Sequence, residues 1–316
     1  MAHQGVSRAV IDDAYRIFLG RPSHAVADLY FEDLGALIST LFRSEEFKSS
    51  LQSRKNALAW PEAQYFFSRD KKIIYCPIGK NACTFFKQVM VKLAEHPHQE
   101  FILHNVHMLT DHVSTGMQLS DCDMDDVEPI LSDPNHFKFA ILRDPAQRLL
   151  SAYIEKFVKN RQAHENVIYH TSPVIRAVQA KEGLVDPDYF LGISFRSLVE
   201  YIVQQPKENL DPHWCPQYLY LGDYEWSNLY TFDMLPQAVT DLEQISGMKL
   251  SAPPANKSGS GIGNPHSGAD QLLPCELDKL PMIAKESFLT PEICTLLNDY
   301  YARDYDIIQN ISRGHI

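Results

Sequence analysis

The stretch from Phe137 to Phe157 reads FKFAILRDPAQRLLSAYIEKF, and its pattern decides the fold class. Residues 137–142, which are apolar except for Lys138, are a candidate for a buried strand. Pro145 then fits the first turn of a helix, because the N–H that proline lacks would have no helical partner there. The stretch therefore predicts a strand followed at once by a helix, over about residues 146–159.

The same order occurs upstream in IIYCPIGKNACTFFKQVM, residues 73–90. An apolar run at 73–76 precedes a turn at 77–81 and a helical pattern at about 84–93. A third strand is predicted at 229–232, with a helix after Pro236, and a last helix at about 291–303. Strands that alternate with helices predict an α/β fold: a P-loop-like parallel sheet flanked by helices.

The N-terminal part has a different pattern. Apolar residues share one helical face over 10–19, Gly20-Arg21-Pro22 breaks that helix, and a second apolar-periodic stretch covers 29–47. We therefore predict a small helical N-terminal extension at 1–55 and a main domain at 65–316.

Composition limits the classes of partner. The chain has 316 residues, 45% of them hydrophobic, and a net charge of −11, which is poorly suited to binding nucleic acid. No apolar run approaches the roughly 20 residues of a membrane-spanning helix, and no signal-peptide core is visible. These features predict a cytoplasmic protein that binds no membrane. With no metal-binding spacing, six cysteines are expected to be reduced thiols that hold no metal: Cys76, Cys83, Cys122, Cys215, Cys275 and Cys294.

The turn at 77–81 is the first chemical signal. A turn that leads into a helix directs free backbone N–H groups and the positive end of the helix dipole at one point. Lys80 adds a cation and Thr84 a hydroxyl, so together they could hold a phosphate. The loop is not a Walker A motif, because Cys76 replaces its first glycine and Asn81 follows the lysine. An ordinary turn with a solvated lysine remains the simpler alternative.

Both stretches resemble the motifs of sulfotransferases that use 3′-phosphoadenosine 5′-phosphosulfate (PAPS), especially the carbohydrate class of the family-2 type. The first family motif is matched by Pro77 and by Lys80-Asn81-Ala82-Cys83-Thr84, with Ile78-Gly79 inserted between them. The second motif is matched in register by Arg143, Asp144, Pro145, Arg148, Leu149, Ser151, Tyr153, Lys156 and Phe157. The resemblance implies that the first motif binds the 5′-phosphosulfate end of the donor. It also implies that Arg143 and Ser151 bind the 3′-phosphate, and both residue types suit phosphate.

Three further stretches agree with this resemblance. Residues 211–217, DPHWCPQ, are similar to a Pro-His-Trp-Arg-Pro-Gln segment of the family, with Cys215 in place of the arginine. His213 and Trp214 in that stretch could equally be packing residues of the core. Asn256-Lys257-Ser258 is similar to a segment that closes over the nucleotide, and residues 300–305 to the closing helix of the family.

The resemblance implies transfer of a sulfuryl group from PAPS to a hydroxyl acceptor, with Lys80 at the departing oxygen. The class of the resemblance implies that this acceptor is a carbohydrate. The acceptor hydroxyl needs a base, and related carbohydrate enzymes use a histidine or glutamate between the two motifs. FILHNVHMLTDH, residues 101–112, offers His107 as our first choice and His104 as our second. His112 lies in the same run, and Asp111 is an acidic alternative.

Two other interpretations stay open. A P-loop-like phosphotransferase would bind ATP with magnesium, and a non-catalytic protein that binds nucleotide or carbohydrate could keep the same fold. In the N-terminal part, AYRIFLGRP at 14–22 and LFRSEEF at 41–47 resemble a small bacterial helical module of the DUF4214-like type. A plain helical extension is the alternative to that resemblance.

Overall fold

The computed structural model describes residues 5–23, 30–47, 57–104, 106–111, 113–163, 166–250 and 263–314. Its centre is a four-stranded sheet with the order β1-β2-β3-β4, made of β1 (Phe66–Ser68), β2 (Ile73–Cys76), β3 (Phe137–Leu142) and β4 (Asn228–Thr231). β2, β3 and β4 are parallel, and β1 is antiparallel to β2. The predicted α/β class with a largely parallel sheet is confirmed, and β1 is a strand that the sequence pattern did not reveal.

Both faces of the sheet are buried, because neighbouring residues of each strand point to opposite sides. On one face the rings of Tyr75 and Phe139 stack with their centroids 4.8 Å apart. On the other face Cys76 and Ala140 belong to a second apolar cluster. This double burial explains why β2 is a continuous apolar run and why β3 is apolar except for Lys138.

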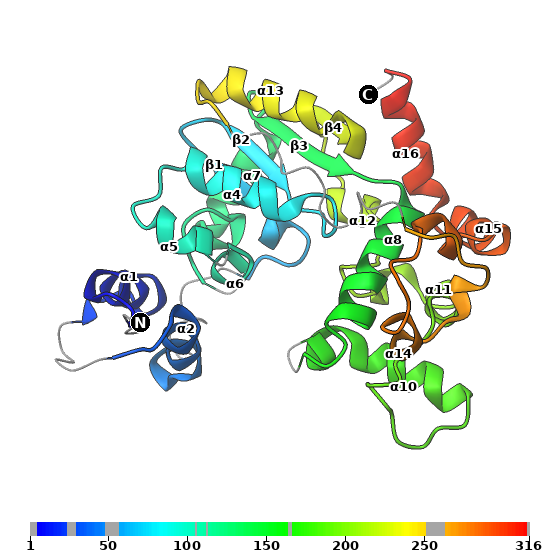
Figure 1. The fold of residues 1–316 in the computed structure, drawn as a ribbon. Coiled ribbons are helices and arrows are strands. Elements are labelled where there is room, and N and C mark those ends of the chain that lie inside the picture. Colours follow the sequence, from blue (N-terminus) through cyan, green and yellow to red (C-terminus); the bar gives the residue numbers. More distant parts are fainter. Residues whose placement is uncertain are drawn as a thin grey trace.

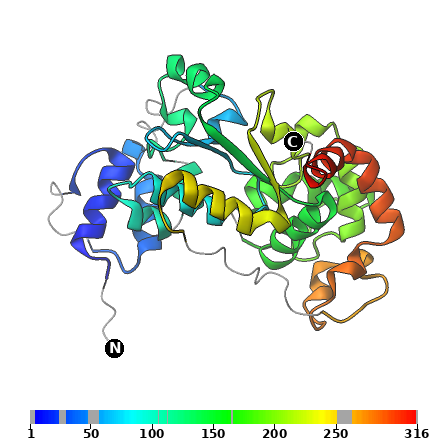
Figure 2. The ribbon, with the colours of Figure 1, turned by 90° about the horizontal axis from the view of Figure 1, so that it is seen from above.

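Helices cover both faces (Figure 1). The apolar cluster on the face with Tyr75 includes residues of α4 (Cys83–Leu93), α5 (Gln99–His104), α6 (Val106–Asp111) and α13 (Leu235–Ser246), and it continues into α1 (Arg8–Leu19), which contacts α5, and α2 (Leu34–Arg43), which contacts α1. The cluster on the other face includes residues of α7 (Met124–Ser132), α8 (Pro145–Tyr153), α10 (Ser172–Lys181), α11 (Phe195–Ile202), α12 (Tyr218–Leu221), α14 (Pro274–Leu277), α15 (Pro291–Tyr300) and α16 (Ala302–Ser312). Figure 2 shows α13 running along the first of these two layers.

Two predicted helices are subdivided in the structure. The helix expected at 146–159 is α8 followed by a π-helical segment, Ile154–Lys159, which we call the π-segment. The helix expected at 291–303 is α15, and α16 continues the chain after Tyr301. A π-helical turn rotates the side chains that follow it, and such turns are frequent at functional sites.

The N-terminal helices pack on the main domain. The ring of Phe18 in α1 lies 6.4 Å from the ring of Phe101 in α5, measured between centroids. Asp13 and His98 form an ion pair at 2.9 Å across the same contact. The division into an extension and a main domain stays a prediction, and these contacts define what a truncation would expose.

Within the described residues, no helix is both long enough and apolar enough to cross a bilayer. All six cysteines are free thiols. The most buried of them, Cys76, has a pKa raised well above its ordinary value by burial, which makes its thiolate unfavourable.

Candidate functional site

The two sequence motifs meet at one edge of the sheet. β2 and β3 are parallel, with Cys76 opposite Ala140, so the loops that follow both strands lie at the same edge. We call residues 77–82, between β2 and α4, the first loop. Because ligands of open α/β sheets bind beyond the carboxyl ends of the strands, this edge is the expected place for a site.

The first loop has an unusual backbone. Lys80 and Ala82 adopt the left-handed region, with φ of 70° and 60°. This conformation is uncommon for residues with a Cβ atom, and such positions cluster at ligand-binding sites. Ala82 is the N-cap of α4 and has no polar side chain to cap the helix. The first N–H groups of α4, from Cys83 and Thr84 onward, therefore suit an anion.

Asn81 locks the first loop to the sheet. Its side chain is buried and donates hydrogen bonds to the carbonyl of Ile141 at 2.8 Å and to Oε1 of Gln217 at 2.6 Å. Gln217 also accepts from the N–H of Arg143 at 3.0 Å and donates to the Arg143 carbonyl at 2.8 Å. The Asn81 side chain thus holds the first loop to the sheet. We therefore expect the predicted contact of Asn81 with the donor to be made by the Asn81 backbone.

Arg143 reaches the first loop from the end of β3. Its Nη1 donates to the carbonyl of Lys80 at 3.2 Å, and its guanidinium lies 4.7 Å from the ring centre of Phe232. Ser151 lies about two turns into α8 and is partly exposed. The structure therefore brings Arg143 and Lys80 together, as the two motifs require, and leaves Ser151 further along the helix.

Arg148 is a site-forming residue whose task was not apparent from the sequence. It is 2% exposed, and its guanidinium donates to three backbone carbonyls, of Gly79 at 2.9 Å, Pro212 at 2.8 Å and Cys215 at 2.6 Å. It ties the first loop to the 211–217 stretch. The match to the family motif at this position is therefore explained by backbone positioning.

The Lys80 side chain is paired with an acid. Its Nζ forms an ion pair and hydrogen bond with Glu155, the second residue of the π-segment. Burial raises the pKa of Glu155, but the Lys80 ammonium and the neighbouring Lys156 outweigh it and lower that pKa to about 2. Sequence reasoning missed Glu155, because a π-helical turn gives no periodicity signal that would place it opposite the loop.

His107 lies at the other end of the first loop. Its Nε2 is 2.7 Å from Oγ1 of Thr84, in the first turn of α4, and its Nδ1 is 3.9 Å from Asp111. Asp111 is also paired with Lys87. Burial raises the pKa of Asp111, whereas Lys87 and His107 lower it, with a net value of about 2. The predicted His107 is therefore brought to a residue of the first motif.

Other predicted residues lie outside the described part of the structure. They are His112, the side chain of His104, and the segment Asn256-Lys257-Ser258.

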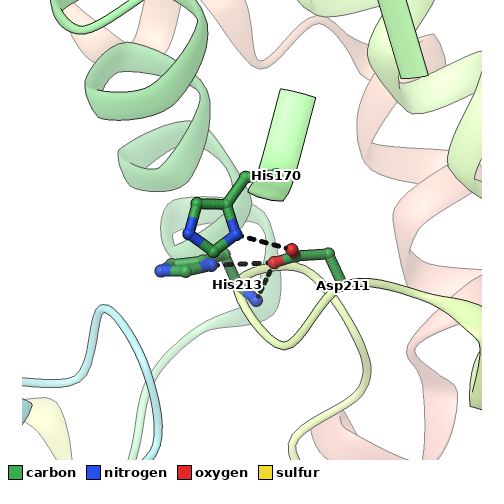
Figure 3. Close-up of side chains that lie close together, drawn as sticks. All are labelled: His170, Asp211 and His213. Atoms are coloured by element: carbon green, nitrogen blue, oxygen red, sulfur yellow. Dashed lines mark hydrogen bonds and ion pairs between the residues drawn. The ribbon is translucent and has the colours of Figure 1, made fainter. Parts of the chain in front are cut away.

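A second histidine cluster adjoins the first loop (Figure 3). Asp211 bonds Nδ1 of His170 at 2.8 Å and Nδ1 of His213 at 2.7 Å. One ligand atom from each of the three residues lies within 4.8 Å of the others, a spacing at which they could hold a metal ion. The sequence predicted no metal site, because His170 is 41 residues from Asp211 and gives no recognisable spacing.

A cavity lies elsewhere on the molecule. A volume of about 550 Å³ opens beside Lys138, Trp226 and Arg303, towards the start of β3. None of the predicted site residues lines this cavity.

Comparison with known proteins gives the family of the chain. The Sulfotransferase family model matches residues 63–249, which is more than half of the chain and includes both motifs. The chain belongs to the sulfotransferase family.

Its relatives include carbohydrate sulfotransferases. Carbohydrate sulfotransferase 14 of Mus musculus is 30% identical over 149 residues, covering 46% of this chain and 36% of the relative. Carbohydrate sulfotransferase 9 of Homo sapiens is 28% identical over 154 residues, with 45% and 31% covered. Carbohydrate sulfotransferase 11 of Rattus norvegicus is 26% identical over 178 residues, with 54% and 49% covered. The matches thus span between a third and a half of these relatives, and no solved structure matches the chain significantly.

Proposed function

We propose that this protein transfers a sulfuryl group from PAPS to a hydroxyl of a carbohydrate. The observation that carries the proposal is the contact between the two motifs, in which Arg143 donates to the Lys80 carbonyl at 3.2 Å. That contact brings two cations and the start of α4 to one edge of the sheet. A ligand with negative groups at both ends, such as PAPS, matches this distribution of charge.

The donor contacts are proposed residue by residue. Lys80, Asn81, Ala82, Cys83 and Thr84 bind the 5′-phosphosulfate through the loop backbone, the lysine and the Thr84 hydroxyl. Arg143 and Ser151 bind the 3′-phosphate. Asn256, Lys257 and Ser258 close over the nucleotide. These assignments rest on the motif matches and on the available N–H groups of α4.

Lys80 is the proposed catalytic cation. Negative charge grows on the bridging oxygen as the sulfuryl group departs, and a fixed ammonium stabilises this charge. Lys80 is paired with Glu155 in the structure, so the incoming phosphosulfate has to compete with a carboxylate for it. The leaving phosphate is neutralised by protein cations, so this proposal needs no metal ion at the leaving group.

A histidine is the proposed proton acceptor. His107 is the choice drawn from the sequence, with His104 second, and the contacts of His107 with Thr84 and Asp111 support a role at the first loop. The carbohydrate acceptor rests on the names of the relatives, which are carbohydrate sulfotransferases.

Nucleotide-dependent stability tests the donor. We expect 3′-phosphoadenosine 5′-phosphate and PAPS to raise the Tm, because a ligand that binds only the folded state stabilises it. ATP with magnesium should have little effect. Stabilisation by ATP with magnesium alone would support the phosphotransferase alternative. Stabilisation by the PAPS product without sulfation of any sugar in a donor-saturated panel would support the binding-protein alternative.

A further inference from the structure

The His170–Asp211–His213 cluster lies against the first loop. A Cβ atom placed on Gly79 would be 3.9 Å from Cδ2 of His213, the carbon bonded to Nε2. Gly79 precedes Lys80, and Arg148 holds the Gly79 carbonyl to the stretch that carries Asp211 and His213. The Nε2 edge of His213 therefore faces the loop at which the phosphosulfate is proposed to bind.

Asp211 sets the tautomer of His213. Burial raises the pKa of Asp211, but hydrogen bonds from His170 and His213 hold it below its usual range, so the carboxyl group is ionised. An ionised carboxylate only accepts hydrogen bonds, so Nδ1 of His213 carries the hydrogen and Nε2 carries the lone pair. The His213 N–H also donates to Asp211 at 2.8 Å, which fixes the loop and the ring together.

The second nitrogen of each ring points away from Asp211 (Figure 3). Nε2 of His213 has no hydrogen-bond partner among the described residues. The charged groups that act on His213 are Asp211, His170, Lys156 and Glu155. Burial lowers the pKa of His213, opposed by Asp211, so its neutral form is favoured at pH 7.

We propose that His213 accepts the proton of the acceptor hydroxyl and that Asp211 is its positioning residue. The inference rests on the function proposed above and replaces His107 in that step. The acceptor oxygen bonds to sulfur while its hydrogen moves to Nε2 of His213. The bond between sulfur and the bridging oxygen breaks, and its electron pair stays on the 5′-phosphate of the product.

His107 is placed differently. Its Nε2 is already bonded to the Thr84 hydroxyl at 2.7 Å, and its side chain is 45% exposed, against 24% for His213. It orients a donor-binding hydroxyl at the start of α4. His213 has a partly buried carboxylate, that of Asp211, on its Nδ1 side and a nitrogen without a described partner, Nε2, on the other. This is the arrangement of an oriented general base.

The test compares His213→Ala, His107→Ala and Asp211→Asn with a matched control, His98→Ala. His98 has a similar exposure, 22%, and a similar carboxylate partner, Asp13 at 2.9 Å, but lies where α1 meets α5. Turnover is measured with radiolabelled PAPS on a panel of glycosides. Affinity for 3′-phosphoadenosine 5′-phosphate is measured by calorimetry.

We expect His213→Ala to lower kcat about 10²–10⁴-fold with unchanged nucleotide affinity, and His98→Ala to change neither. Added imidazole should restore part of the activity of His213→Ala. The acidic limb of the pH–rate profile should disappear in that variant. The defect should shrink on an acceptor whose reacting hydroxyl is made more acidic by a neighbouring fluorine, which a merely structural role would not produce. Asp211→Asn should lower kcat without imidazole rescue.

Near-normal turnover of His213→Ala would overturn the inference, as would these signatures appearing in His107→Ala instead. Loss of wild-type activity on chelation, restored by Zn²⁺ through His170 and His213, would overturn it in favour of a metal site. A wild type that binds PAPS but sulfates nothing would overturn both the proposed function and this inference, whereas an active wild type with a near-normal His213→Ala variant overturns the inference alone.

Discussion

The carboxyl edge of the sheet and the N-terminal helices are held by different forces. At the edge, Arg148 and Asn81 bind specific carbonyls and an amide, so each contact has a direction. In the N-terminal helices, the ring of Phe18 packs against those of Phe42 and Phe47, at centroid distances of 5.6 and 5.4 Å. Directional contacts fix atoms for chemistry, whereas ring packing supplies stability and tolerates small shifts.

Within the first loop, the largest effect is expected at Lys80. Lys80→Ala should lower kcat about 10²–10³-fold, because it removes a cation that acts on charge developing in the transition state. Affinity for 3′-phosphoadenosine 5′-phosphate should fall less than kcat. Single-turnover kinetics and calorimetry on the same preparation measure both. An equal loss in both quantities would make Lys80 a binding contact only, and Lys71→Ala is the control outside the first loop.

Arg148 tests whether the directional contacts at the carboxyl edge contribute to the stability of the fold. Arg148→Ala should lower the free energy of unfolding by about 3 kcal/mol, since three backbone carbonyls lose a donor. Arg69→Ala is the matched control, because Arg69 is exposed, pairs with Asp126 at 3.0 Å and lies 5.9 Å from the ring centre of Phe67, so its loss should cost under about 1 kcal/mol. Urea unfolding measures both variants. Similar losses would mean that the Arg148 bonds add nothing beyond a surface pair.

Arg143 and Ser151 test donor binding. Arg143→Ala should weaken binding of 3′-phosphoadenosine 5′-phosphate by about 1.5–3 kcal/mol, and Ser151→Ala by less, because a charged hydrogen bond is stronger than a neutral one. Calorimetry with the product and with 5′-AMP, which lacks the 3′-phosphate, separates the contacts. Unchanged affinity in both variants would refute the assignment of the 3′-phosphate.

The smallest effect on the site is expected from the N-terminal helices. A chain that starts near residue 56 should keep its nucleotide affinity, because the matched motifs all lie beyond it. Its Tm should fall, because the contact of Phe18 with Phe101 is lost. The truncation exposes the ring of Phe101, which should lower solubility. Phe101→Ser in the truncated chain removes this ring and should restore solubility. A folded truncation that no longer binds nucleotide would show that the division into two parts is wrong.

Much of the edge could be predicted from the sequence, because strand-to-helix transitions leave local patterns. Three of these patterns involve residues that are close in sequence. They are the largely apolar stretches at 73–76 and 137–142, the position of Pro145, and the spacing from Lys80 to Thr84. β1 was not predicted, because three residues are too few to show a periodic pattern. The packing of α1 against α5 was not predicted, because local sequence patterns do not show which distant surfaces of a chain pack together.

The pairing inside the site could not be predicted. Glu155 faces Lys80 across 75 residues of sequence, and Gln217 reaches Asn81 across 136. His170 joins Asp211 only after the chain has folded back along α10 and α11. The motifs predict which residues bind the donor, whereas the partners that restrain those residues follow from tertiary packing.

Transfer of labelled sulfur from PAPS to a sugar tests the central claim most directly. The wild-type chain is incubated with PAPS labelled at sulfur and a panel of glycosides, and the products are identified by mass. The account predicts a labelled sulfate ester of at least one sugar, formed by the wild type and almost absent with Lys80→Ala. Labelled sugar formed equally well by Lys80→Ala, or no labelled sugar from a wild type that binds PAPS, would contradict it.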